Sequence, residues 1–173
     1  MGKAVVGSAL GLAAAAAQAQ ESSNRVAAER AWSVFVEDEP TECWIVSAPT
    51  ETVNTRDGRV VAVRRGDIAM FVSYRPDTGV EGEVSFKGGY PFAEGSIVTV
   101  QISGTSFEMF TSPKDETAWP PTPADDARLT TAMKRGAEAI VTGRSGRGTN
   151  TRDTFSLLGF TAALEEAEKR CGA

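Results

Sequence analysis

The last part of the chain, residues 143–171, constrains the fold most, because it reads as a glycine-rich turn, a strand and a helix. In the strand the side chains alternate, and the inward face comprises Thr151, Asp153, Phe155 and Leu157. After Gly159 the apolar side chains recur every three or four residues, which indicates an amphipathic helix. Thr161 is the expected N-cap of this helix, and Cys171 lies at its far end.

The amino-terminal residues have the composition of an export signal. Lys3 gives a basic start, an almost wholly apolar run follows, and Ala17-Gln18-Ala19 fits a signal-peptidase site. We therefore expect a signal peptide over 1–19 with cleavage after Ala19, and a periplasmic or secreted, outer-surface protein. Polar residues 20–31 are predicted to form a flexible leader, and 32–173 a single domain with no transmembrane segment.

The chain has two cysteines, Cys43 and Cys171. In an oxidising compartment an even number of cysteines favours a disulfide, and two cysteines allow one intramolecular pairing. The alternative is a pair of buried free thiols. Export therefore predicts a bridge between Cys43 and Cys171.

Upstream of the C-terminal segment the pattern is that of many short strands and one helix. Strands are predicted at 32–36, 43–48, 53–56, 59–64, 68–74, 83–87, 97–102, 106–110 and 137–142. Asp57-Gly58 is a two-residue hairpin signal. The internal helix is expected to have Thr122 as N-cap, Pro123 in its first turn and Gly136 at its end. The expected fold is mainly β, a β-sandwich with one internal helix and a C-terminal helix.

Composition excludes several classes of function. The sequence contains no histidine, so Ser-His and Cys-His catalysis have no base, and histidine metal sites cannot form. The net charge of −5 argues against general nucleic-acid binding, which requires a basic face. We expect no metal site and no cofactor.

Asp153 is the one carboxylate placed where catalysis is conceivable. It shares a strand face with Phe155, and burial there would raise its pKa, as in the acid of a glycosidase. A buried carboxylate more often pairs with an arginine, and that interpretation is favoured here.

The best candidate binding loop is the turn before the last strand. Arg144, Ser145 and Arg147 lie among its glycines, and Arg152 follows; together they can hold a carboxylate, sulfate or phosphate. A solvated hairpin turn is the alternative and the favoured one. Arg65-Gly66-Asp67 spells a tripeptide that integrins bind, and the favoured alternative is an ordinary turn with glycine between two charged residues.

Tyr90 and Phe92 follow two glycines and are the second candidate contact. Two interpretations stay open for them. They form an exposed aromatic patch suited to a protein or glycan partner, or they belong to a loop tucked over the core.

Several longer runs resemble one known family. They are 42–49 (ECWIVSAP), 88–92 (GGYPF), 132–136 (AMKRG), 142–149 (TGRSGRGT) and 153–164 (DTFSLLGFTAAL). These runs are similar to those of the invasion-associated locus B family. The resemblance implies an exported alphaproteobacterial protein with an immunoglobulin-like β-sandwich, from a family named for a member linked to host-cell entry. It implies no enzymatic activity, no cofactor and no established site residues.

The expected function is that of a non-catalytic envelope protein that binds an envelope protein or a surface glycan. The alternative from a different class is a carboxylate-dependent enzyme acting on cell-wall or exopolysaccharide sugars, with Asp153 as its acid. A structural stabiliser of the envelope is a third possibility. Fold alone does not decide among them.

Overall fold

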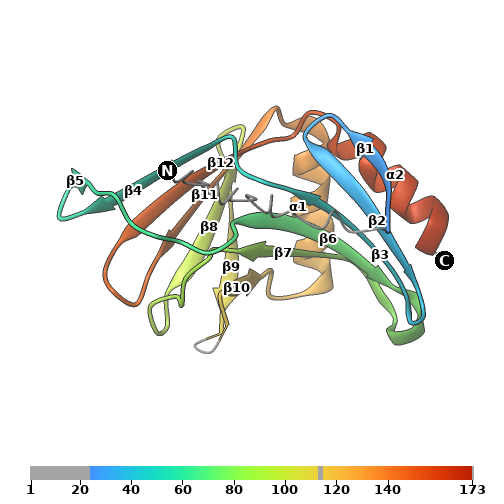
Figure 1. Cartoon of the computed structure of the whole chain (residues 1–173), viewed down its shortest axis with the longest axis horizontal. Coiled ribbons are helices and arrows are strands. Elements are labelled where there is room, and N and C mark those ends of the chain that lie inside the picture. Colours follow the sequence, from blue (N-terminus) through green and yellow to red (C-terminus); the bar gives the residue numbers. More distant parts are fainter. Residues whose placement is uncertain (1–23, 113–114, 173) are drawn as a thin grey trace, which may run out of the picture.

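The structure is a computed structural model that describes residues 24–112 and 115–172. Within these ranges the elements are β1 (Arg25–Glu29), β2 (Trp32–Asp38), β3 (Thr41–Ser47), β4 (Glu51–Arg56), β5 (Arg59–Val60), β6 (Ala69–Arg75), the short 3-10 helix η1 (Pro76–Thr78), β7 (Val80–Lys87), β8 (Ile97–Ile102), β9 (Thr105–Thr111), β10 (Thr117–Trp119), α1 (Pro123–Arg135), β11 (Glu138–Arg144), β12 (Asn150–Ser156) and α2 (Phe160–Cys171). The two helices lie beside the strongly curved sheet (Figure 1).

The described strands form one antiparallel sheet in the order β1-β2-β3-β6-β7-β10-β9-β8-β11-β12-β4-β5. The three-residue strand β10 pairs with both β7 and β9 and so joins the two halves. Because the sheet curves, these halves face each other: Phe86 of β7 packs edge-on against Phe155 of β12, with ring centroids 6.1 Å apart. The predicted mainly β fold with an internal helix and a C-terminal helix is confirmed.

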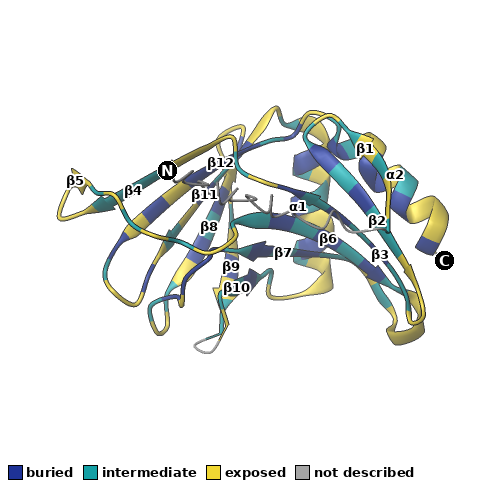
Figure 2. Cartoon of the chain, viewed as in Figure 1, coloured by how far each residue is buried: buried dark blue, intermediate teal, exposed yellow. Residues whose placement is uncertain are grey.

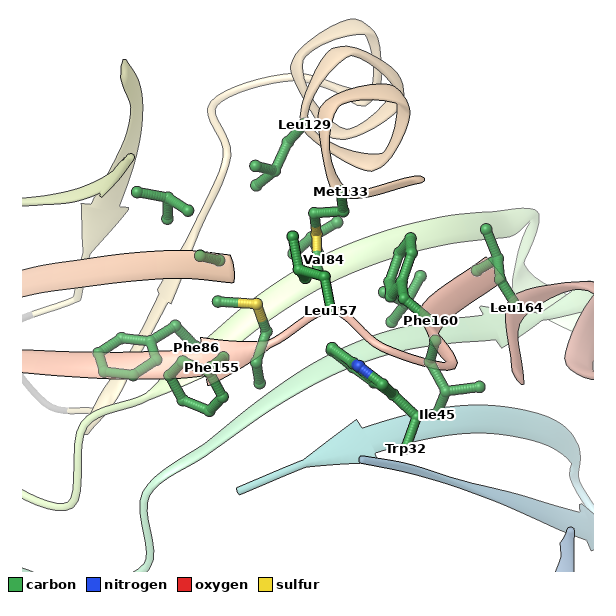
Figure 3. Packing of buried hydrophobic residues seen from close by; sticks show 14 of the residues in the cluster. Trp32, Ile45, Val84, Phe86, Leu129, Met133, Phe155, Leu157, Phe160 and Leu164 are labelled. Carbon is green, nitrogen blue, oxygen red and sulfur yellow. The ribbon is translucent and has the colours of Figure 1, made fainter. Parts of the chain in front are cut away.

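The core lies between the facing halves of the sheet and the two helices (Figure 3). Leu129 and Met133 of α1 are buried with the strands, while Trp32 of β2 packs edge-on against Phe160 of α2 at 5.0 Å. Figure 2 shows the same division, with exposed residues concentrated on outer helix faces and loops. The predicted inward face of the last strand is confirmed, since Thr151, Asp153 and Phe155 of β12 and the following Leu157 are all buried.

Helix α2 is clamped to the sheet as the cysteine count predicted. It packs against β2 and β3, and its buried stripe is the expected one of Phe160, Ala163, Leu164, Ala167 and Cys171. The stripe ends at a disulfide from Cys171 to Cys43 of β3, which joins positions 128 residues apart. The predicted bridge is confirmed.

Helix α1 covers a part of β7 that has no neighbouring strand on that side. The Thr122 side chain accepts a hydrogen bond from the Asp125 amide, and Gly136 follows the last turn, so the predicted caps are confirmed. One turn into the helix, the buried Asp126 accepts a hydrogen bond from the Val84 amide at 2.8 Å. Because β10 pairs only with the end of β7, this carboxylate satisfies an amide that would otherwise lack a partner.

The prediction of a flexible leader over 20–31 is wrong for Arg25–Glu29, which form β1 and pair with β2. All five residues of β1 are exposed or only partly buried, so the strand shows no apolar alternation. Its backbone hydrogen bonds hold it in place, and a pattern of side chains does not report them. The predicted signal peptide at 1–19 lies outside the described residues.

Two local predictions are also corrected. Helix α2 begins at Phe160 with Gly159 as its N-cap, so Thr161 does not cap it; Gly159 has φ 88°, a conformation that favours glycine. The strand predicted over 59–64 ends at Val60. The following segment, 61–68, has no regular secondary structure and crosses from β5 to β6 as the long green connection in Figure 1.

A candidate anion-binding cavity

Segment 61–68 is anchored to the sheet by a buried ion pair. The Arg65 guanidinium donates two hydrogen bonds to the Asp153 carboxylate of β12, at 2.7 and 2.6 Å. It donates two more to the Gly88 carbonyl, at 3.0 and 2.8 Å. The Arg65 side chain is 5% exposed and that of Asp153 is fully buried. The favoured interpretation of Asp153 as an ion-pair partner is therefore the observed one.

A close backbone approach fixes the same segment against residues 88–92. The Gly66 amide donates to the Gly89 carbonyl at 2.8 Å. Gly89 has φ 70°, and a Cβ built on it would lie 2.6 Å from the Gly66 carbonyl oxygen, so this contact requires glycine. Arg65 is consequently not presented to solvent, which removes the arginine that an integrin-binding tripeptide would need.

The turn between β11 and β12 is tightly closed by its own hydrogen bonds. The Ser145 amide donates to the Thr149 carbonyl at 2.9 Å, and the Thr149 amide donates to the Ser145 hydroxyl at 3.1 Å. The Gly148 amide donates to the Ser145 carbonyl, and the Gly146 amide to that of Pro91. These amides are occupied, so any ligand-binding capacity of the turn lies in its side chains.

Between this turn, segment 61–68 and residues 88–92 lies a cavity of about 570 Å³, which we call the arginine cavity. Its charged lining comprises Arg56, Arg64, Arg65, Arg147 and Glu116. Its hydroxyl groups come from Tyr90, Ser145, Thr149 and Thr151. Three segments far apart in the sequence thus contribute cations to one hollow.

The arginines of the cavity differ in what they contact. Arg65 is neutralised by Asp153, and its guanidinium lies 4.9 Å from the centroid of the Tyr90 ring. Arg56 donates to the Thr149 hydroxyl at 2.7 Å. Arg64 and Arg147 are exposed, and the structure gives them no hydrogen bond or ion pair within the described part of the chain.

Tyr90 and Phe92 are both buried, so the aromatic loop is tucked over the core and is not an exposed patch. Phe92 packs against the rings of Phe86 and Tyr90 and forms a β-bridge with Ser145. Only Tyr90 of the aromatic pair lines the cavity. Burial raises the pKa of its phenol, whose oxygen lies 2.6 Å from that of Thr151.

The structure divides the predicted arginine cluster in two. Arg147 and Ser145 line the arginine cavity, whereas Arg144 and Arg152 line a neighbouring depression of about 460 Å³, and Thr151 borders both. Arg152 follows Thr151 by one residue, and the pleat of the strand therefore points it to the opposite face. Its guanidinium lies 3.9 Å from the Glu51 carboxylate, a contact exposed to solvent.

Comparison with known proteins identifies the family. The invasion associated locus B (IalB) protein family matches residues 32–168. The chain belongs to the IalB family. Among curated proteins, none matches it.

A solved IalB structure has a similar fold. The crystal structure of invasion associated protein b from Bartonella henselae superposes with a TM-score of 0.54 at 17% sequence identity, over 83% of this chain and 95% of that one. At this identity the likeness concerns the fold.

Of the five charged residues that line the arginine cavity, the sequence pattern pointed to Arg147 and missed four, namely Arg56, Arg64, Arg65 and Glu116. Arg64 ends a run predicted to be a strand, and Arg65 follows it as the first residue of the Arg65-Gly66-Asp67 tripeptide. The pairing of Arg65 with Asp153 spans 88 residues, a distance at which no local pattern reports contact. A doubled arginine in a chain of net acidic charge was the signal available.

The residues of the site are better suited to binding a ligand than to acid-base catalysis. Both oxygens of Asp153 accept hydrogen bonds from Arg65, so this carboxylate is not free to exchange a proton with a substrate. Among the described residues no group of three acidic or cysteine side chains is placed to hold a metal ion. No helix in the described ranges is long and apolar enough to cross a bilayer.

Proposed function

We propose that this IalB protein is an exported, non-catalytic protein of the cell envelope that binds a protein or glycan partner through the arginine cavity. The observation that carries the proposal is a hollow lined by Arg64 and Arg147, two cations with no partner among the described residues. Charged groups left exposed in a concave site are suited to recognition.

Two features support export. The Cys43–Cys171 disulfide is typical of oxidising compartments outside the cytoplasm. The sequence of residues 1–19 has the basic start, apolar run and small residues of a signal peptide. Both features support a periplasmic or outer-surface location.

The chemistry of the candidate site supports a non-catalytic role. The sequence lacks histidine, and the carboxylate with catalytic potential, Asp153, is committed to Arg65. The arginines of the cavity are suited to binding, because charge-assisted hydrogen bonds from arginine are strong and directional.

A pull-down from envelope extract tests the role of the cavity. We expect Arg147→Ala to lose partners that the unaltered protein retains, and Arg144→Ala to retain them. Both variants remove an exposed arginine next to the same turn, but only Arg147 lines the cavity. Identical partners for all three proteins would refute the assignment of binding to this cavity.

Export has its own test. Mass spectrometry of protein from intact cells should show a mature chain that begins after Ala19 and has no alkylatable thiol. An uncleaved amino terminus with two free thiols would refute export and oxidation together.

A further inference from the structure

We infer that the arginine cavity binds an acidic saccharide unit whose carboxylate is held by Arg64 and Arg147. This inference rests on the proposed binding function and gives the chemical class of its ligand. It follows from three properties of the cavity: its unbalanced charge, the hydroxyl groups of its lining and its fixed walls.

The charge of the cavity is opposite to that of the whole protein. Four arginines and one acidic residue, Glu116, line the cavity. Arg65, one of the four, is neutralised by Asp153, which is buried and is not part of the lining. Three cations then face one carboxylate, in a chain of net charge −5. A concave site of this kind attracts and orients an anion, and a planar guanidinium matches a carboxylate with two parallel hydrogen bonds.

The size and lining favour a sugar acid over the side chain of a peptide. About 570 Å³ is within the range of sites that take a small molecule, roughly 300–1,000 Å³. Hydroxyl groups of Tyr90, Ser145, Thr149 and Thr151 accompany the cations, with Val63 and Pro91 as the apolar side chains of the lining. A saccharide acid combines a carboxylate and several hydroxyl groups with apolar C–H faces on its ring, and so suits such a mixed lining.

The walls of the cavity are held in place before any ligand arrives. Segment 61–68 is tied to Asp153 through Arg65 and to Gly89 through Gly66. The β11–β12 turn is tied to Pro91 by the Gly146 amide. The Gly88 amide donates to the Glu116 carbonyl and fixes the acidic side of the rim. A rigid site loses little freedom on binding, which preserves affinity.

Isothermal titration calorimetry with a galacturonate trimer tests the inference on the intact, disulfide-bonded protein. We expect saturable binding that weakens as salt is added, about tenfold weaker binding for Arg64→Ala and for Arg147→Ala, and no change for Arg152→Ala. All three arginines are exposed, but Arg152 lies outside the cavity. Glu116→Gln removes the opposing charge and should tighten binding severalfold.

The neutral galactose trimer and a glutamate trimer complete the experiment. Equal binding of neutral and acidic saccharides, or an equal loss in Arg147→Ala and Arg152→Ala, overturns the inference. Tighter binding of the glutamate trimer than of the galacturonate trimer assigns the cavity to an acidic peptide and also overturns it. If no saccharide binds while Arg147→Ala still loses partners in the pull-down, the ligand class fails and the proposed function stands.

Discussion

Replacing Arg65 by alanine should destabilise the fold far more than the same change at Arg64. The two arginines are neighbours in the sequence, yet Arg65 makes four hydrogen bonds to Asp153 and Gly88 while its neighbour lies exposed without a partner among the described residues. Arg65→Ala leaves a fully buried carboxylate without its counter-ion and a carbonyl without its donor. Both losses act on groups that cannot reach water without rearrangement.

The expected loss of stability in Arg65→Ala follows from the two groups left unpaired, the Asp153 carboxylate and the Gly88 carbonyl. Removing one member of a buried ion pair costs about 3–5 kcal/mol, and an unsatisfied carbonyl costs about 1–3 kcal/mol more unless water enters. Allowing for water entry, we expect a loss of about 4 kcal/mol in the free energy of unfolding. For a chain of this size that corresponds to a fall in Tm of about 8–16 °C. Urea denaturation and calorimetry measure both quantities.

The control and a double variant sharpen the test. Arg64→Ala should change the free energy of unfolding by no more than about 0.5 kcal/mol, as exposed positions usually do. Arg65→Met combined with Asp153→Leu should recover much of the loss, because replacing both members of a buried pair by apolar residues is often neutral. Equal stability of Arg64→Ala and Arg65→Ala would refute the structural role assigned to the pair.

Three further predictions concern other parts of the fold. Burial raises the pKa of Asp126 from 3.8 to about 6, so this group favours folding below about pH 4 and loses that contribution as the pH rises through 6. In urea titrations, the free energy of unfolding of Asp126→Asn should therefore rise by up to about 3 kcal/mol relative to that of the unaltered protein as the pH increases from 4 to 8. A constant difference in the free energy of unfolding across this pH range would contradict the prediction. Replacing Cys43 and Cys171 by serine should lower the free energy of unfolding by about 5 kcal/mol through loop-closure entropy. An unchanged urea midpoint would show that the disulfide does not stabilise the fold. Gly89→Ala should cost about 1–3 kcal/mol, and an unchanged Tm would show that the close approach can relax.

Elements set by short-range patterns were predictable from the sequence. The inward face of β12, the buried stripe of α2 and the caps of α1 each depend on residues a few positions apart. The disulfide was predictable because two cysteines allow one pairing. Strand β1 was not predictable in this way, since it is held by its backbone hydrogen bonds and none of its residues is fully buried.

The candidate site was only partly predictable, because it is assembled from three distant segments. The β11–β12 turn was found from its glycines and arginines, and Arg147 and Ser145 do line the cavity. Strand pleating separated Arg152 from them, and Phe92 is buried because its ring fills the core beside Phe86. Arg64 joins the site only because Arg65 anchors its segment to Asp153 across the fold.

The most direct test of the central claim is an NMR titration that follows the guanidinium Nε–Hε signals as the galacturonate trimer is added. We expect the signals of Arg64 and Arg147 to shift saturably, with those of Arg144 and Arg152 unchanged. Shifts confined to Arg144 and Arg152, or no saturable shift at any of the four, would contradict a ligand site in the arginine cavity.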